Sequence, residues 1–143
     1  MEIKQMTISD LEEIKETLTT QFDDFWSYSC FQRELENPKS TYFVARLDNQ
    51  IVGFAGIWEA VDDIHITNIA VKKDLRQHGI ASKLLEKLIE TAKLKNTSSL
   101  TLEVNCKNSA AIHLYEKYNF VNLGRRKKYY NGTDDAYIMT LFF

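Results

Sequence analysis

The chain has 143 residues and a formal net charge of −2, with 44% hydrophobic and 27% charged side chains. This composition is too apolar for a disordered protein, and five glycines and one proline exclude collagen-like or linker-rich architectures. The small net charge hides an asymmetry, because residues 1–71 carry a net charge of −8 and residues 72–143 carry +6. We expect a single domain over residues 1–143 whose acidic and basic halves serve different partners.

The sequence shows no signal for export, membrane insertion or metal binding. Its first ten residues, MEIKQMTISD, lack an apolar stretch, and the longest apolar run, residues 51–58, is far shorter than the roughly 20 residues that span a bilayer. Cys30 and Cys106 are far apart and match no zinc or CxxC spacing, and the three histidines form no ligand pattern. We therefore expect a cytoplasmic protein with reduced thiols, no membrane contact and no metal.

The hydrophobic pattern alternates between strand-like and helix-like segments. In chain order we expect a short strand over 1–6, a helix opened by a capping box at Ser9–Glu12, a second helix ending before Pro38, a hairpin of 41–47 and 51–58, a strand over about 64–71, a helix over 79–95, a strand over 99–105, a helix over about 108–118, and two last strands over about 120–130 and 136–142. This order predicts an α/β domain with a mixed sheet flanked by helices.

The expected strand after the first hairpin contains a change of phase. Ile64 and Ile66 occupy even positions, whereas Ile69 and Val71 occupy odd ones. Because side chains alternate between faces, one extra residue near Thr67-Asn68 indicates a β-bulge, which leaves backbone groups available to a ligand. A central strand buried on both faces would give the same pattern without a bulge.

A loop suited to pyrophosphate follows this strand, with the sequence Arg76-Gln77-His78-Gly79-Ile80-Ala81 at the start of a helix. The first N–H groups of a helix lack internal partners, and the helix dipole favours anions there. Gly79 and Ala81 allow a phosphate close to the backbone, and positive charge surrounds this position at Lys72, Lys73, Arg76 and Lys83. The loop matches neither a Walker A nor a GxGxxG pattern, so an ordinary helix start remains the alternative.

Three longer segments make the pattern specific. They read NIAVKKDLRQHGIASKLLEKLIE, LEVNCKNSAAIHLYEKYNF and RRKKYYNGTDDAYIMTLFF. Together they resemble the GNAT acetyltransferases, and within that family the bacterial ribosomal-protein-alanine N-acetyltransferases, from about residue 22 to the C-terminus. The chain departs from the family pattern with Asn119 in place of Gly, Phe25 in place of Pro and Arg76 in place of the commoner Gln. The resemblance implies a GNAT fold, in which a mixed, mostly antiparallel sheet is flanked by helices.

The resemblance also implies acetyl-CoA as co-substrate and assigns roles to particular positions. The residues implied to bind acetyl-CoA are Ile69, Ala70, Val71, Arg76, Gln77, His78, Gly79, Ile80, Ala81, Ser82 and Asn108. Glu103 is implied to be the general base and Tyr115 the general acid. Trp26 and Tyr130 are implied to lie on the acceptor side.

Acid–base chemistry favours an α-amine as the acceptor. At pH 7, deprotonation costs about 1 kcal/mol for an α-amine and about 4–5 kcal/mol for a lysine side chain, so one glutamate suffices for the first. The ordinary pKa of tyrosine, about 10, exceeds that of a thiol, about 8.5, so a hydrogen bond from Tyr115 to the thiolate is more favourable than full proton donation. By resemblance, the acceptor is the N-terminal alanine of a small-subunit ribosomal protein.

Three other functions are compatible with parts of the sequence. A GNAT enzyme for small amines or lysine side chains would carry the same cofactor motifs, and a binding module would retain the CoA site without turnover. The run RRKKYY at 125–130 is also compatible with a nucleic-acid patch. We expect this run to form a hairpin strand beside the acceptor, without direct nucleic-acid binding.

Overall fold

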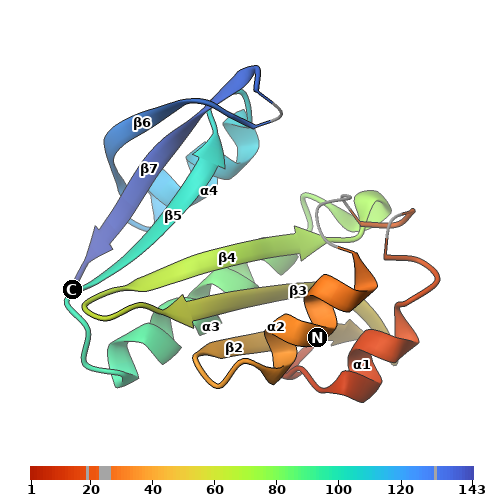
Figure 1. Cartoon of the computed structure of the whole chain (residues 1–143). Coiled ribbons are helices and arrows are strands. Elements are labelled where there is room, and N and C mark those ends of the chain that lie inside the picture. The colour runs from red at the N-terminus through yellow and green to blue at the C-terminus, as the bar shows by residue number, and fades with distance from the viewer. Residues whose placement is uncertain (19, 23–26, 131) are drawn as a thin grey trace.

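The computed structural model describes residues 1–18, 20–22, 27–130 and 132–143. Over these residues the chain forms a seven-stranded sheet in the order β1-β2-β3-β4-β5-β7-β6 (Figure 1). The strands are β1 (Glu2–Gln5), β2 (Ser40–Leu47), β3 (Gln50–Glu59), β4 (Ile64–Val71), β5 (Ser99–Asn105), β6 (Val121–Tyr130) and β7 (Asp134–Phe142). Every neighbouring pair is antiparallel except β4 and β5, which confirms the predicted mixed sheet.

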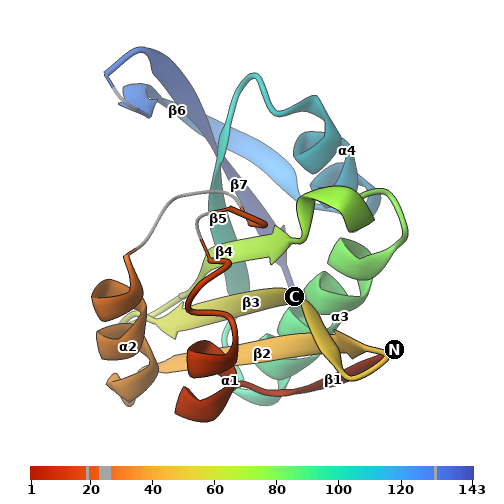
Figure 2. The ribbon, with the colours of Figure 1, turned by 90° about the vertical axis from the view of Figure 1, so that its right-hand side faces the viewer.

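Helices cover both faces of this sheet (Figure 2). They are α1 (Ile8–Glu13), α2 (Tyr28–Glu36), α3 (Ile80–Leu94) and α4 (Ser109–Lys117), with a short 3-10 helix, η1, at Lys73–Leu75. The apolar residues of α3 and α4 form one core with one face of the sheet, and those of α1 and α2 form a second core on the other face. None of the described helices is long and apolar enough to cross a membrane.

Helix α1 begins two residues earlier than expected. Its N-cap is Thr7, whose side chain accepts from the Asp10 backbone N–H while the Asp10 carboxylate accepts from the Thr7 N–H. The prediction that Ser9 caps this helix with Glu12 is wrong. The predicted pair, Ser9 and Glu12, and the observed pair, Thr7 and Asp10, are both separated by the three positions that a capping box requires. The Asp10 carboxylate also accepts a 2.8 Å hydrogen bond from Arg46 on β2, a tertiary contact that stabilises the observed cap.

The predicted bulge is present in β4. Gly56 on β3 pairs with Asn68 and the next residue of β3 pairs with Ile66, so Thr67 is the extra residue. Among the described residues, β4 and β5 pair only at His65 and its preceding neighbour. Beyond that point the two strands diverge, as Figure 1 shows. The bulge therefore lies at the opening of a wedge between the two halves of the sheet.

Candidate active site

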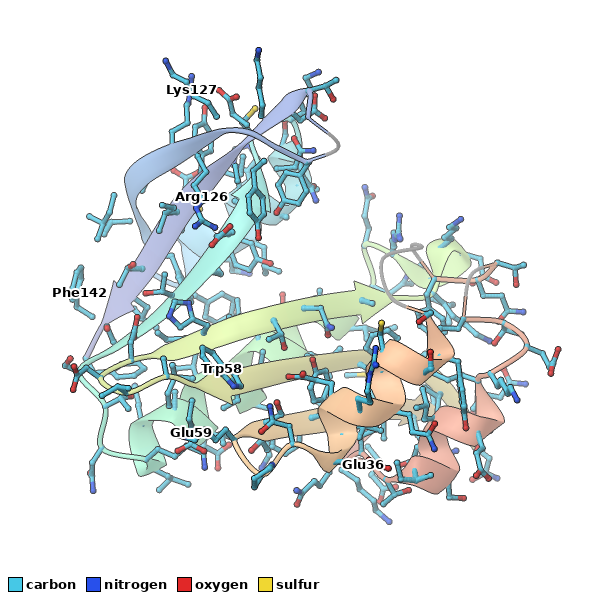
Figure 3. All side chains as sticks on the ribbon, viewed as in Figure 1. Glu36, Trp58, Glu59, Arg126, Lys127 and Phe142 are labelled. Atoms are coloured by element: carbon cyan, nitrogen blue, oxygen red, sulfur yellow. The ribbon has the colours of Figure 1, made fainter. Side chains whose placement is uncertain are left out.

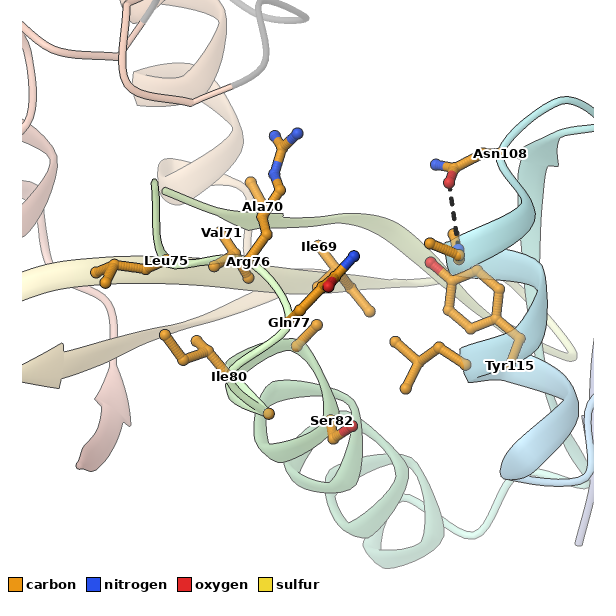
Figure 4. Close-up of a pocket in the computed structure, with 15 residues that line it drawn as sticks. Ile69, Ala70, Val71, Leu75, Arg76, Gln77, Ile80, Ser82, Asn108 and Tyr115 are labelled. Atoms are coloured by element: carbon orange, nitrogen blue, oxygen red, sulfur yellow. Dashed lines mark hydrogen bonds between the residues drawn. The ribbon is translucent and has the colours of Figure 1, made fainter. Parts of the chain in front are cut away.

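A cavity of about 370 Å³ lies where β4 leaves β5 (Figure 4). Its walls are the end of β4, the loop before α3, the first turn of α3, and α4 with its N-cap. The residues that line it are Ile69, Ala70, Val71, Leu75, Arg76, Gln77, Gly79, Ile80, Ala81, Ser82, Asn108, Ala110, Ala111, Leu114 and Tyr115. Every residue that the sequence assigned to acetyl-CoA binding lines this cavity, with the exception of His78.

The loop before α3 turns through two left-handed residues, Gln77 at φ 66° and Gly79 at φ 80°. Gly79 is the N-cap of α3 and gives this helix no side-chain cap, whereas Ser27 and Asn108 cap α2 and α4 with their side chains. A Cβ built at Gly79 meets no atom within 4 Å. The exposed amides and this open space fit the phosphates of a nucleotide cofactor.

His78 does not line the cavity. Its Nδ1 lies 2.8 Å from the carbonyl oxygen of Arg76 and 3.1 Å from that of Leu75. Because both partners are acceptors, Nδ1 carries the proton and donates to them. The ring therefore stabilises the loop from outside.

Asn108 and Tyr115 reach the cavity from α4. The Asn108 Oδ1 accepts from the Ala111 backbone N–H at 3.2 Å and caps the helix (Figure 4). Tyr115, two helical turns later, is only 9% exposed. Burial, with a smaller contribution from Tyr130, raises the pKa of Tyr115 to about 12. The hydroxyl is therefore a proton donor throughout the neutral range.

Glu103 lies outside this cavity, on the opposite face of β5. Its neighbours Leu102 and Val104 are buried in the core beneath α3, whereas the Glu103 side chain is 27% exposed. Both of its carboxylate oxygens accept from Nη1 of Arg126, at 3.1 and 3.2 Å. Figure 3 shows Arg126 on the hairpin that β6 forms with β7.

The sequence did not predict the role of Arg126, which appeared there only as one cation of RRKKYY. Arg126 pairs with Ala136 on β7, and Ala136 pairs with Asn105 on β5. Because the side chain of Ala136 is small, the arginine can extend across β7 and reach Glu103 on β5. Its guanidinium also lies 5.1 Å from the ring centroid of Tyr129. No local pattern indicates this contact, because it depends on the register of three strands.

The predicted acceptor-side residues are only partly described. Tyr130 packs edge-to-face on Tyr129 at 5.0 Å, and burial raises its pKa to about 12, with Tyr129 and Glu103 adding to the effect. Trp26 lies outside the described residues. Across the described ranges, no group of three or more His, Cys, Asp or Glu side chains is placed to hold a metal ion.

Comparison with known proteins decides the family. The sequence model of the acetyltransferase (GNAT) family matches residues 11–120. The chain belongs to the GNAT acetyltransferase family. Enzymes of this family use acetyl-CoA, and two relatives that match 96% of this chain are named N-acetyltransferases. It is therefore an acetyl-CoA-dependent N-acetyltransferase.

Three relatives illustrate the similarity. A Bacillus subtilis (strain 168) protein with the provisional name [ribosomal protein bS18]-alanine N-acetyltransferase is 36% identical over 140 residues, covering 96% of this GNAT chain and 92% of its own length. An N-alpha-acetyltransferase of Saccharolobus solfataricus is 31% identical, covering 96% and 90%. The crystal structure of the ribosomal-protein-S18-alanine N-acetyltransferase from Escherichia coli superposes with a TM-score of 0.88 at 29% identity, covering 99% of this chain and 92% of that one. The predicted GNAT fold is thus confirmed.

Proposed function

We propose that this enzyme transfers the acetyl group of acetyl-CoA to the N-terminal α-amine of a protein, with the N-terminal alanine of a small-subunit ribosomal protein as acceptor. The observation that carries the proposal is the agreement of its relatives, whose names specify either a ribosomal alanine or an N-alpha position. The acid–base argument supports the same acceptor, since an α-amine needs only about 1 kcal/mol to lose its proton at pH 7.

The proposed cofactor site is the cavity beside α3. Acetyl-CoA supplies the thioester carbonyl that the acceptor nitrogen attacks. The backbone of Ile69–Val71 holds the pantetheine arm, the amides of the 76–82 segment hold the pyrophosphate, and Asn108 contacts the cofactor from α4. Gly79 is the most sensitive position, because its missing side chain leaves the approach to the first amides of α3 open.

The proposed chemistry is direct transfer with no covalent enzyme intermediate. Glu103 accepts a proton from the α-ammonium group, directly or through one water. The neutral nitrogen then forms a bond to the carbonyl carbon and the carbon–sulfur bond breaks. The Tyr115 hydroxyl donates a hydrogen bond to the departing thiolate, and the second proton of the amine passes from the nitrogen to that sulfur, so the products are the amide and the CoA thiol. Since Arg126 holds both oxygens of Glu103, the acceptor must share or displace this cation.

Replacing Tyr115 by Phe tests the thiolate role. A hydrogen bond to a charged group contributes about 1.5–3 kcal/mol, so we expect kcat to fall about 10- to 100-fold. Because the pKa of Tyr115 is raised to about 12, the hydroxyl stays protonated between pH 7 and pH 10. The ratio of the wild-type kcat to that of Tyr115→Phe should therefore remain constant over this range. Tyr118→Phe is the control, since the Tyr118 hydroxyl donates to Glu86 on α3 and the residue does not line the cavity. Equal losses in both variants would contradict the role.

The choice of acceptor is tested with two peptides. One begins with a free alanine and contains no lysine; the other has the same sequence with a blocked α-amine and one free lysine. We expect acetylation of the first peptide and no measurable transfer to the second. Mass spectrometry of each peptide measures the acetylation. Equal rates would favour the enzyme class that acetylates lysine side chains, and acetyl-CoA binding without any transfer would favour a binding module.

A further inference from the structure

A polar cluster at the bulge of β4 has no role in the chemistry above. It begins with Tyr42 on β2, which pairs with Gly56 on β3, and Gly56 in turn pairs with Asn68 on β4. A Cβ at Gly56 would lie 2.2 Å from Cε2 of the Tyr42 ring. The absence of a side chain at Gly56 therefore lets the Tyr42 ring lie across β3 and reach the bulge.

The bulge directs two consecutive side chains to the Tyr42 hydroxyl. That hydroxyl lies 2.7 Å from the hydroxyl of Thr67 and accepts from Nδ2 of Asn68 at 3.4 Å. In a regular strand, residues 67 and 68 would point to opposite faces. Burial raises the pKa of Tyr42 above its usual range, so the group at the centre of this cluster is a neutral hydroxyl.

Asn68 has an unused acceptor. Its Oδ1 is buried and has no hydrogen-bond partner among the described residues. Buried side-chain polar atoms are nearly always paired, so such an oxygen points to a partner that binds in function. The hydrogen bond from Nδ2 to the Tyr42 hydroxyl is long, at 3.4 Å, and therefore weak.

The position of Asn68 matches the approach of an acceptor. Asn68 precedes Ile69, which lines the cofactor cavity on the α3 side, whereas Tyr42 belongs to the core beneath α1 and α2. Glu103 lies on this same second face, because Leu102 and Val104 point into the α3 core. Asn68 and Glu103 thus belong to the two strands that diverge beyond His65, β4 and β5, and both lie on the face away from the cofactor cavity.

We propose that the Asn68 carboxamide accepts a hydrogen bond from the main-chain N–H of the acceptor's second residue, and so selects polypeptide N-termini. This inference rests on the proposed function. In an N-terminus whose second residue is not proline, the first peptide N–H is two bonds from the Cα that carries the reacting amine, whereas a lysine ε-amine or a simple alkylamine has no amide at that distance. Glu103 accepts the proton, and Asn68 recognises the group that identifies the amine as an α-amine.

The test compares two acceptors and three enzymes. The acceptors are an alanine-initiated peptide and the same peptide with an ester oxygen in place of the second residue's N–H. The enzymes are the wild type, Asn68→Ala and Thr67→Val, a control that alters the same bulge but keeps the carboxamide. We expect Asn68→Ala to lower kcat/KM about 10-fold on the peptide and less than twofold on the ester. The wild type should itself be about 10-fold slower on the ester.

Each outcome supports or overturns the proposal. Equal losses on peptide and ester would mean that Asn68 only supports the bulge, and no loss on the peptide would remove it from acceptor binding. A loss in Thr67→Val as large as that in Asn68→Ala would assign the effect to the bulge. Calorimetry should give all three enzymes the same affinity for acetyl-CoA. A wild type that binds acetyl-CoA but acetylates neither acceptor would overturn the proposed function itself, and this inference with it.

Discussion

Glu103→Gln is expected to bind acetyl-CoA with unchanged affinity and to lose about 10²-fold in kcat at pH 7. Glutamine keeps the shape of the side chain but cannot accept the proton of the α-ammonium group. General-base catalysis typically contributes about 10²- to 10⁴-fold to the rate. We expect a loss at the lower end of this range, because roughly a tenth of the α-amine is already neutral at pH 7. Raising the pH towards 9 should restore part of the rate, since the amine then loses its proton in solution.

The control for this variant is Arg126→Gln. Glu103→Gln also breaks the ion pair with Arg126, so a loss of rate by itself does not identify the base. Arg126→Gln breaks the same pair and keeps the carboxylate, and we expect its kcat to stay within about fivefold of the wild type, as befits a half-exposed pair. Equal losses in the two variants would assign the effect to the ion pair. Full activity of Glu103→Gln at pH 7 would show that Glu103 is not the base.

Gly79→Trp is expected to weaken acetyl-CoA binding by at least about 10²-fold. An indole at this position would fill the space over the first amides of α3, and it would displace the phosphates whose charge those amides and the helix dipole stabilise. Isothermal titration calorimetry measures the affinity directly. Unaltered affinity would contradict the assignment of this loop to the phosphates.

The control for Gly79→Trp must separate blocking from backbone strain. The φ of Gly79 is +80°, a conformation that is unfavourable for most residues and that asparagine tolerates best. Gly79→Asn therefore introduces a small side chain with little strain, and we expect a much smaller loss of affinity than in Gly79→Trp. Thermal unfolding of both variants reports any loss of stability. Equal losses of affinity would indicate that the backbone conformation, rather than the open space, decides binding.

The sequence predicted residues that line one cavity, the proposed cofactor site, because the signals for them are local. The loop at 76–81 and the start of α3 are consecutive in the chain, so the small residues at Gly79 and Ala81 lie next to the helix amides in any fold that forms this helix. The bulge was also visible, because the phase of Ile64 and Ile66 against Ile69 and Val71 is a property of one strand. Even so, the sequence did not indicate that His78 lies outside the lining of the cavity, with its ring hydrogen-bonded to the loop carbonyls.

The acceptor half was decided by tertiary structure. The contact between Glu103 and Arg126 requires the register of β5, β7 and β6, and the contact of Tyr42 with Asn68 requires that of β2, β3 and β4. Such registers depend on the packing of the whole sheet, because each pairing joins residues that are distant in the chain.

By itself the sequence determined the order of helices and strands, the family and the asymmetry of charge between the halves of the chain. The structure decided which charges meet. Arg126, one of the cations in the basic half, lies against Glu103 instead of the cofactor cavity. The physical reason is that periodicity and turn chemistry act over a few neighbouring residues, whereas a site assembled across a diverging sheet depends on strands that only the complete fold brings together.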